Sequence, residues 1–263
     1  MDNKLRSISL DKGPVSIGVI GFGRFGRLTA RYLATDFEMV VASRSADAAA
    51  VAQLGARPGT LAEACAQSIV VPCVPISRLQ DVLAAMKPLL AADSLVADVC
   101  SVKQYPVEWM QTILPPTTPI LATHPMFGPD SAARSLKGQK IVLCPVRLSD
   151  QRYQRIKSYL ESLGLKVYET TPEEHDRQIS VSLALTHYIG RSLKAFGARP
   201  LDIDTEGYQR LLHILGVVEN DTWQLFEDMN RYNPHAAGQR EKFRQALATV
   251  EERLAAGGAT PRF

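Results

Sequence analysis

The feature that most constrains this chain is a glycine-rich turn, Gly21-Phe-Gly23-Arg-Phe-Gly26, between an apolar run and a helical segment. In that context the first glycine permits a tight turn, the second lets a pyrophosphate approach, and the third lets helix and strand pack closely. The helix N-terminus then offers N–H groups and partial positive charge to phosphates. A lone motif of this kind is also compatible with a glycine turn of no function. With its context it predicts a dinucleotide site made by Gly21, Gly23, Arg24, Phe25 and Gly26.

Short apolar runs alternate with helical segments from Val15 to about Cys144. This alternation is typical of a parallel sheet with helices on its faces. We therefore expect an α/β fold whose first domain, residues 1–170, is a Rossmann-type parallel-sheet nucleotide-binding domain.

The second part of the chain has a helical pattern throughout. Thr171 provides an N-cap and Pro172 suits the first helical position, which predicts a long helix that runs to about Phe196 and stops at Gly197. Residues 171–263 are therefore expected to form an all-helical domain, with a loose tail, GGATPRF.

The cofactor type is indicated by the residues about 20 positions beyond the glycines. An NAD enzyme places an acid there against the ribose 2′-hydroxyl, whereas this chain has Ser43, Arg44 and Ser45. An arginine with two hydroxyls binds a 2′-phosphate that an acid would repel. The sequence predicts NADP as cofactor, with Arg24 as a second candidate cation. The alternative is that Arg44 is a solvated loop charge.

The charge and hydropathy of the chain indicate which kinds of partner it binds. The 30 basic and 27 acidic residues give a net charge of +3 and are spread along the chain, without the basic stripe typical of nucleic-acid binding. We expect no nucleic acid and a small anionic substrate. No run of 18 apolar residues and no signal-peptide pattern occurs, so the sequence predicts no membrane association and a cytoplasmic location.

Four cysteines lie among apolar residues and none belongs to a C-x-x-C motif: Cys65, Cys73, Cys100 and Cys144. Such cysteines are typical of reduced core thiols, so we expect no metal and no disulfide.

A histidine is placed at the ligand-binding edge of the predicted sheet. The run PILATH delivers His124 to the carboxyl end of a strand, where open parallel sheets bind ligands. Pro125 biases His124 towards extended backbone angles. A single histidine is often structural, but this position favours a functional one.

Three segments, GFGRFG, DVCSVK and THPMFGPDS, occur in an order and spacing that resembles the prephenate/arogenate dehydrogenase family of tyrosine biosynthesis. The resemblance covers the chain from Ser16 to about Asn233 and is weaker in its second half. It implies NADP-dependent oxidative decarboxylation of arogenate to tyrosine, or of prephenate to 4-hydroxyphenylpyruvate.

The same resemblance implies roles for individual residues. His124 would accept the proton of the ring hydroxyl, and Ser101 would orient the same oxygen, although a turn serine is the alternative. His187 matches a second active-site histidine of the family and would contact the substrate. Arg191, one helical turn further on, would face the same ligand. Lys103 would either add positive charge nearby or be an ordinary surface lysine.

Asp221 bears on the choice of substrate. An acid in the pocket would favour arogenate, which carries an ammonium where prephenate carries a ketone. The alternative is a helix cap, because Gln224 follows three residues later. The prephenate-type branch carries an arginine anchor in the segment that corresponds to HILGVVENDTW, and this chain has none there. The candidates to replace it are Arg191, Arg210 and Arg231.

The resemblance also implies a homodimer through the helical domain, with Leu211, Leu215 and Trp223 as candidate contacts. Two other functions remain open. A hydroxyacid or imine reductase would share the glycine turn but would not account for THPMFGP. A non-catalytic NADP-binding protein would bind the cofactor without turnover of a cyclohexadienol.

Overall fold

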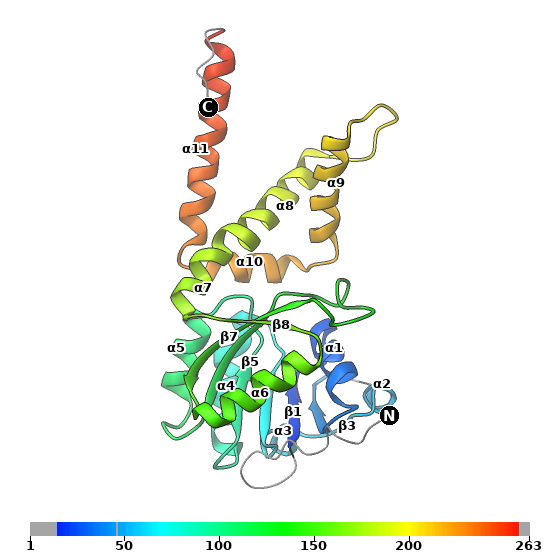
Figure 1. Cartoon of the computed structure of the whole chain (residues 1–263), viewed down its shortest axis with the longest axis vertical. Coiled ribbons are helices and arrows are strands. Elements are labelled where there is room, and N and C mark those ends of the chain that lie inside the picture. Colours follow the sequence, from blue (N-terminus) through cyan, green and yellow to red (C-terminus); the bar gives the residue numbers. More distant parts are fainter. Residues whose placement is uncertain (1–14, 46, 258–263) are drawn as a thin grey trace. The chain divides into compact units, whose positions relative to one another are not determined.

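The computed structural model describes residues 15–45 and 47–257. The N-terminal segment before residue 15, and the GGATPRF tail from residue 258, lie outside the described residues. The chain divides into two compact units, of which the first ends at His175 and the second begins at Asp176. In Figure 1 the first unit is coloured from blue to green and the second from yellow-green to red.

One sheet with the strand order β3-β2-β1-β4-β5-β6-β7-β8 forms the centre of the first unit (Figure 1). Its strands are β1 (Ser16–Ile20), β2 (Glu38–Ala42), β3 (Arg57–Pro58), β4 (Ile69–Pro72), β5 (Leu95–Asp98), β6 (Ile120–Pro125), β7 (Lys140–Arg147) and β8 (Lys166–Glu169). Strands β1 to β6 pair in parallel, as the alternation of apolar and helical segments predicts.

Strand β7 departs from the parallel pattern. It pairs antiparallel with β6, and β8 pairs parallel with β7. Residues 126–139, between β6 and β7, contain no helix. A parallel pair needs a crossover, usually a helix, whereas a loop that turns back gives an antiparallel pair. The expected parallel arrangement therefore holds for β1 to β6, and the antiparallel β7 is an addition at this edge of the sheet.

Helices cover both faces of the sheet. They are α1 (Arg24–Leu33), α2 (Ala48–Gln53), α3 (Leu61–Cys65), α4 (Leu79–Met86), α5 (Gln104–Ile113) and α6 (Asp150–Ser162), with short 3-10 turns η1 (Ile76–Arg78) and η2 (Lys87–Leu89). Leu28 of α1 and Tyr153 of α6 pack into one core cluster with Leu95 and Leu121 of the sheet. On the other face, α4 contacts both α3 and α5.

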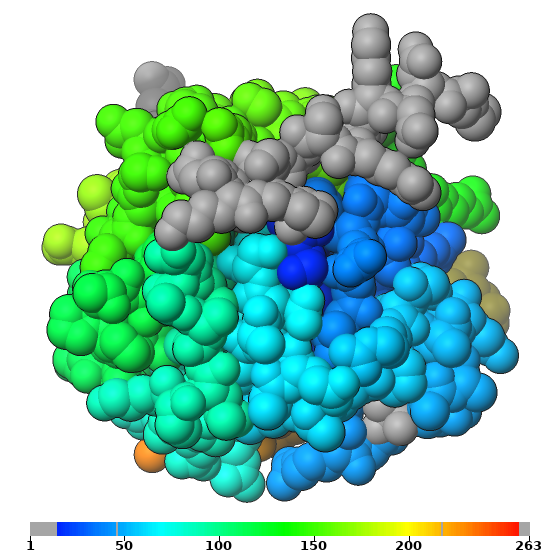
Figure 2. Space-filling model, turned by 90° about the horizontal axis from the view of Figure 1, so that it is seen from below, coloured from blue at the N-terminus to red at the C-terminus, as the bar shows by residue number. Residues whose placement is uncertain are grey.

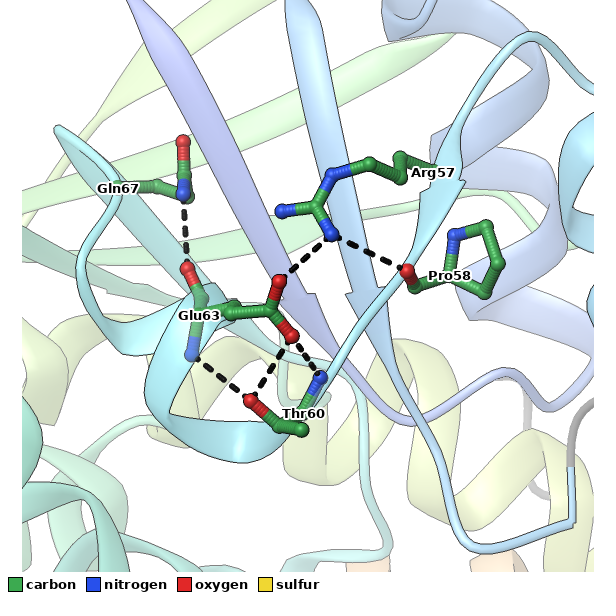
Figure 3. A network of polar contacts seen from close by, with 5 residues as sticks. All are labelled: Arg57, Pro58, Thr60, Glu63 and Gln67. Atoms are coloured by element: carbon green, nitrogen blue, oxygen red, sulfur yellow. Dashed lines mark hydrogen bonds and ion pairs between the residues drawn. The ribbon is translucent and has the colours of Figure 1, made fainter.

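A polar network joins the edge strand β3 to α3 (Figure 3). Thr60 caps α3 by accepting a hydrogen bond from the backbone N–H of Glu63, and the Glu63 carboxylate accepts one from the backbone N–H of Thr60. Arg57 donates to the same carboxylate at 2.7 Å. This reciprocal cap fixes the start of a helix of only five residues. In the view from below, the blue to cyan part of the chain, which includes these elements, covers much of the lower right of the visible face (Figure 2).

The second unit is helical in its described part, as expected. The chain enters it through α7 (Pro172–Ile179), continues through a π-helical segment η3 (Ser180–Leu185) into α8 (Thr186–Phe196), and then forms α9 (Glu206–Glu219), α10 (Trp223–Arg231) and α11 (Ala236–Ala255). Thr171 caps α7 and Gly197 ends α8 with φ +85°, so both predicted ends are confirmed. The π-helical segment was not predicted. None of the described helices is both long and apolar enough to span a bilayer.

Candidate functional site

The glycine turn has the geometry that dinucleotide binding requires. Gly21 has φ +102°, and a Cβ there would lie 2.3 Å from the carbonyl oxygen of Cys73. A Cβ on Gly26 would lie 2.2 Å from the carbonyl oxygen of Gly21. At Gly23, by contrast, a Cβ would have no heavy atom of the described residues within 4 Å apart from its chain neighbours and the nearby backbone of α1. Two glycines are therefore required by packing, and the middle one leaves the backbone open to a ligand.

This open backbone lies at the start of α1. Gly23 is the N-cap residue of α1, and no side chain of the described residues caps that end. A helix N-terminus of this kind attracts phosphate through its N–H groups and dipole. The residues present therefore fit the pyrophosphate of a dinucleotide.

Ser43, Arg44 and Ser45 directly follow β2, the strand next to β1 in the sheet. Arg44 and Ser45 are exposed, and Ser43 is partly buried. Arg44 makes no ion pair with any described residue. A cation without an acidic partner is thus available at the strand end where the cofactor ribose is recognised in such folds.

Arg24 is in a different situation. Its guanidinium donates to both carboxylate oxygens of Asp130, at 2.7 and 2.8 Å. The ring of Phe25 lies 6.4 Å from that of Phe127. The loop that follows β6 therefore packs on the glycine turn, and the charge of Arg24 is shared with Asp130.

The carboxyl ends of β5 and β6 are tied together by a buried ion pair. Lys103 donates to the Asp98 carboxylate, and both side chains are completely buried. Asp98 also accepts hydrogen bonds from the backbone N–H groups of Cys100, at 3.0 Å, and Thr123, at 3.2 Å. Lys103 donates further to the carbonyl oxygen of Thr123. The alternative that Lys103 is a surface lysine is wrong.

Ser101 and His124 are positioned by this network. Each follows a residue that the network holds, Cys100 for Ser101 and Thr123 for His124. Their strands, β5 and β6, are parallel neighbours, so both residues lie at one edge of the sheet. The Ser101 hydroxyl is buried and makes no hydrogen bond with any described residue. A buried hydroxyl without a partner is costly unless a ligand satisfies it.

His124 contacts a second histidine that the sequence did not single out. Its Nδ1 lies 2.8 Å from Nε2 of His175, and both side chains are buried. Burial first, then His175 and Lys103, lower the pKa of His124 well below its usual value. The ring is therefore neutral at neutral pH and able to accept a proton. The two histidines are 51 positions apart, so no local pattern could have indicated their contact.

Three candidate substrate residues come together in the second unit. Nε2 of His187 lies 3.7 Å from Oδ2 of Asp221, and Arg191 donates to the backbone carbonyl of Asp221 at 2.5 Å. The first distance is too long for a hydrogen bond. Burial lowers the pKa of His187, while Asp221 raises it and Arg191 lowers it. His187 is therefore neutral at neutral pH.

Aromatic rings fix the position of Arg191. Its guanidinium lies 5.4 Å from the ring centre of Trp223 and 5.7 Å from that of Phe226, both on α10. Nε of Arg191 and Nδ1 of His187 are buried and have no hydrogen-bond partner among the described residues. Two nitrogens of one cluster thus lack partners, which is rare for buried groups.

The cap interpretation of Asp221 is wrong. The side chain that caps α10 belongs to Thr222, which accepts from the backbone N–H of Leu225 at 3.1 Å. Gln224 donates instead to Asp228. Of the arginines that might replace the missing anchor, Arg210 pairs with Glu206 on the surface and Arg231 lies over the ring of Tyr232. Only Arg191 of these three is joined to Asp221 by a contact between described residues.

The π-helical segment ends at Leu185, two residues before His187. Asp176, Ser180 and His187 are polar residues of this helical stretch, and all three side chains are buried. A π-helical segment widens the helix and changes the direction of the side chains that follow, and such segments occur frequently at functional sites. The helical periodicity of the sequence does not predict this π-helical segment, and so it does not predict how the side chains at the start of α8 are placed.

Comparison with known proteins agrees with these features. Residues 37–169 match the family described as "Prephenate dehydrogenase, nucleotide-binding domain", and residues 192–259 match "TYRAAT1-like, C-terminal domain". Arogenate dehydrogenase 2, chloroplastic, of Arabidopsis thaliana is 33% identical over 96% of this chain and 74% of its own length. Arogenate dehydrogenase 1, chloroplastic, of the same plant is 30% identical over 93% of this chain, which spans 40% of that protein.

A solved structure shows the same fold. The prephenate dehydrogenase of A. aeolicus, in complex with hydroxyphenyl propionate and NAD+, has a TM-score of 0.75 at 19% identity, covering 94% of this chain and 92% of its own. At that identity the likeness concerns the fold alone.

Proposed function

Because this chain belongs to the prephenate/arogenate dehydrogenase family, we propose that it catalyses the NADP-dependent oxidative decarboxylation of arogenate to tyrosine. Prephenate is the alternative substrate of the same reaction. The observation that carries the substrate choice is the Asp221 carboxylate beside a buried neutral His187. In this proposal residues 1–170 bind the dinucleotide and residues 171–263 bind the substrate and form the dimer.

The cofactor proposal rests on the ends of β1 and β2. The open backbone at Gly23 and the start of α1 would hold the pyrophosphate. Arg44, with Ser43 and Ser45, would bind the 2′-phosphate that distinguishes NADP from NAD. When bound, the cofactor supplies a nicotinamide ring that takes up a hydride.

His124 is proposed as the proton acceptor. His124 would take the proton of the substrate's ring hydroxyl, and the bound cofactor would supply the acceptor for the hydride of the carbinol carbon. The bond to the ring carboxylate breaks, carbon dioxide leaves, and its electron pair completes the aromatic ring. The resulting phenolate takes back one proton. Ser101, whose buried hydroxyl has no hydrogen bond to a described residue, would donate to the reacting oxygen and hold it near His124.

The second unit is proposed to bind the charged groups of the substrate. Arogenate carries an ammonium, which pairs with Asp221, while prephenate carries a ketone that offers no donor. Arg191 and His187 each have a buried N–H or ring nitrogen without a partner among the described residues, and a substrate carboxylate would satisfy both. Arg191 thereby takes the place of the arginine that HILGVVENDTW lacks.

A steady-state assay with two substrates and two cofactors tests this function. We expect the specificity constant to be highest for arogenate with NADP, and turnover to give one carbon dioxide per NADPH. A chain that binds NADP but turns over neither cyclohexadienol would overturn the proposal and leave a non-catalytic NADP-binding protein. Turnover of an imine or hydroxyacid alone would replace it with a reductase.

A homodimer is part of the proposal. Of the three residues expected to contact the partner, Leu211 is 41% exposed, Trp223 is 57% exposed and Leu215 is partly buried. Leu211 and Trp223 would therefore be free to pack against a second copy. Light scattering should give twice the mass of 28.9 kDa, and a monomer at micromolar concentration would refute it. Location in the cytoplasm stays a prediction from the sequence.

A further inference from the structure

We propose that His175 is a positioning residue that fixes the tautomer of His124, so that Nδ1 of His124 carries the hydrogen and Nε2 accepts the substrate proton. This inference rests on the proposed function of His124. It adds a residue to the site that neither the sequence patterns nor the comparisons assign.

The contact between the two rings supports the proposal. Nδ1 of His124 and Nε2 of His175 are 2.8 Å apart, a full hydrogen-bond distance, and the ring centres are 5.0 Å apart in an edge-on arrangement with 75° between the planes. Both side chains are buried, 5% exposed for His124 and 3% for His175. Water therefore cannot readily replace either partner, and one nitrogen must donate while the other accepts.

The two possible arrangements of the hydrogen have different chemical consequences. If Nε2 of His175 donates, Nδ1 of His124 accepts, and the remaining nitrogen of His124 carries a hydrogen and cannot act as a base. If Nε2 of His175 accepts, His124 holds its hydrogen on Nδ1, and its Nε2 lone pair is free for a proton. Only the second arrangement is compatible with proton abstraction by His124.

The surroundings keep His124 neutral before the reaction. The charged groups near His124 are Lys103 and, paired with it, Asp98. A buried lysine disfavours a second positive charge close by, and so does a neighbouring imidazole that can itself be charged. When His124 takes the substrate proton, the hydrogen bond from its Nδ1 to His175 stabilises the new imidazolium.

A direct test is the tautomer itself. Nitrogen-15 NMR of protein labelled in its histidines, of which the chain has five, distinguishes a protonated Nδ1 from a protonated Nε2. We expect His124 to carry hydrogen on Nδ1 in the wild type and to lose this preference in His175→Leu. A wild type with hydrogen on Nε2 of His124 would overturn the inference, and this readout requires no turnover.

The kinetic test uses two substitutions of His175. His175→Leu removes the hydrogen-bond acceptor and should lower kcat by roughly 10- to 10³-fold, which is part of what a general base contributes. The affinity for NADP should stay within about twofold of the wild-type value. Glutamine offers an acceptor oxygen near the position of Nε2 and should restore most of kcat. It also removes the electrostatic effect of the His175 ring, which lowers the pKa of His124, so the acid limb of kcat/KM should move to higher pH.

A double-variant cycle separates positioning from a structural role. In the His124→Asn background, His175→Leu should lower kcat no further, because His175 acts through His124. Additive losses, or no rescue by His175→Gln at equal Tm, would overturn the inference while leaving the proposed function intact. Absence of wild-type turnover with either substrate would overturn the proposed function alone, since the NMR experiment still decides the tautomer.

The matched control is His213→Leu, on an exposed histidine of α9. It should change neither kcat nor the tautomer of His124.

Discussion

Lys103 and Asp98 form a completely buried ion pair that ties the end of β5 to the end of β6. The Asp98 carboxylate also accepts hydrogen bonds from two backbone N–H groups, that of Cys100 after β5 and that of Thr123 on β6. Because the residues next in sequence are Ser101 and His124, one ion pair positions both residues that we propose to act on the reacting oxygen. Its charges are satisfied by hydrogen bonds, which is the condition under which a buried pair is tolerated.

Lys103→Met should therefore destabilise the protein strongly. Removing one member leaves an uncompensated buried carboxylate, which typically costs about 3–5 kcal/mol. Urea unfolding followed by circular dichroism measures the loss. Lys87→Met, on an exposed lysine, is the control and should stay within about 0.5 kcal/mol of the wild type. Equal effects of the two substitutions would show that the ion pair contributes nothing.

His124→Asn should lower kcat by roughly 10²–10⁴-fold, the range expected for a single general base. NADP affinity should be nearly unchanged, because the glycine turn and Arg44 are untouched. Stopped-flow turnover and NADP titration measure the two quantities on the same preparation. Turnover close to that of the wild type would remove His124 from the mechanism.

Arg44→Ala should weaken NADP binding much more than NAD binding. A charge-assisted contact contributes about 1.5–3 kcal/mol, so the NADP preference should fall by roughly 10- to 100-fold. Arg31→Ala, at the far end of α1, is a control that removes the same charge elsewhere. Equal losses for both cofactors, or a wild type that prefers NAD, would contradict the assignment of Arg44.

Asp221→Asn should lower the specificity constant for arogenate and raise that for prephenate, because the ammonium loses its charged partner. The ratio of the two constants should change by roughly 10- to 100-fold, the value of one charge-assisted contact. Asp202→Asn, in the exposed segment before α9, should leave the ratio unchanged. If the ratio is insensitive to Asp221→Asn, the arogenate preference has no support from this residue.

Glu63 should contribute to stability in a pH-dependent manner. Hydrogen bonds from the Thr60 backbone, then from Arg57 and the Thr60 hydroxyl, lower its pKa from 4.5 to about 2 (Figure 3). A carboxyl whose pKa is lower in the folded state stabilises the protein above its unfolded pKa and loses that effect as the pH falls towards 2.

The check is the difference in unfolding free energy between wild type and Glu63→Gln, measured at several pH values. This difference should be largest near neutral pH and shrink below about pH 4. Glu108→Gln, on an exposed carboxyl of α5, should show no such trend. A constant difference at all pH values would mean that the ionised form of Glu63 has no special role.

Much of the fold could be predicted because it follows from local patterns. The parallel strands β1 to β6, the glycine turn, the cap at Thr171 and the stop at Gly197 each depend on residues within a few positions of one another. The antiparallel β7 and the π-helical segment before His187 could not be predicted. The first depends on how a loop of 14 residues returns to the sheet, and the second on how α8 packs.

In the candidate site, too, some features follow from local sequence and others depend on contacts between distant residues. The glycine turn, the position of Ser43-Arg44-Ser45 after β2 and the strand end that carries His124 could be predicted from the residues alone, because turns and strand ends are local properties. Three contacts appear only in the folded chain: Lys103 is buried against Asp98, Asp221 lies beside His187 and does not cap α10, and His175 contacts His124. Each of these is a contact whose energy depends on burial and distance in space, which the order of residues along the chain does not specify.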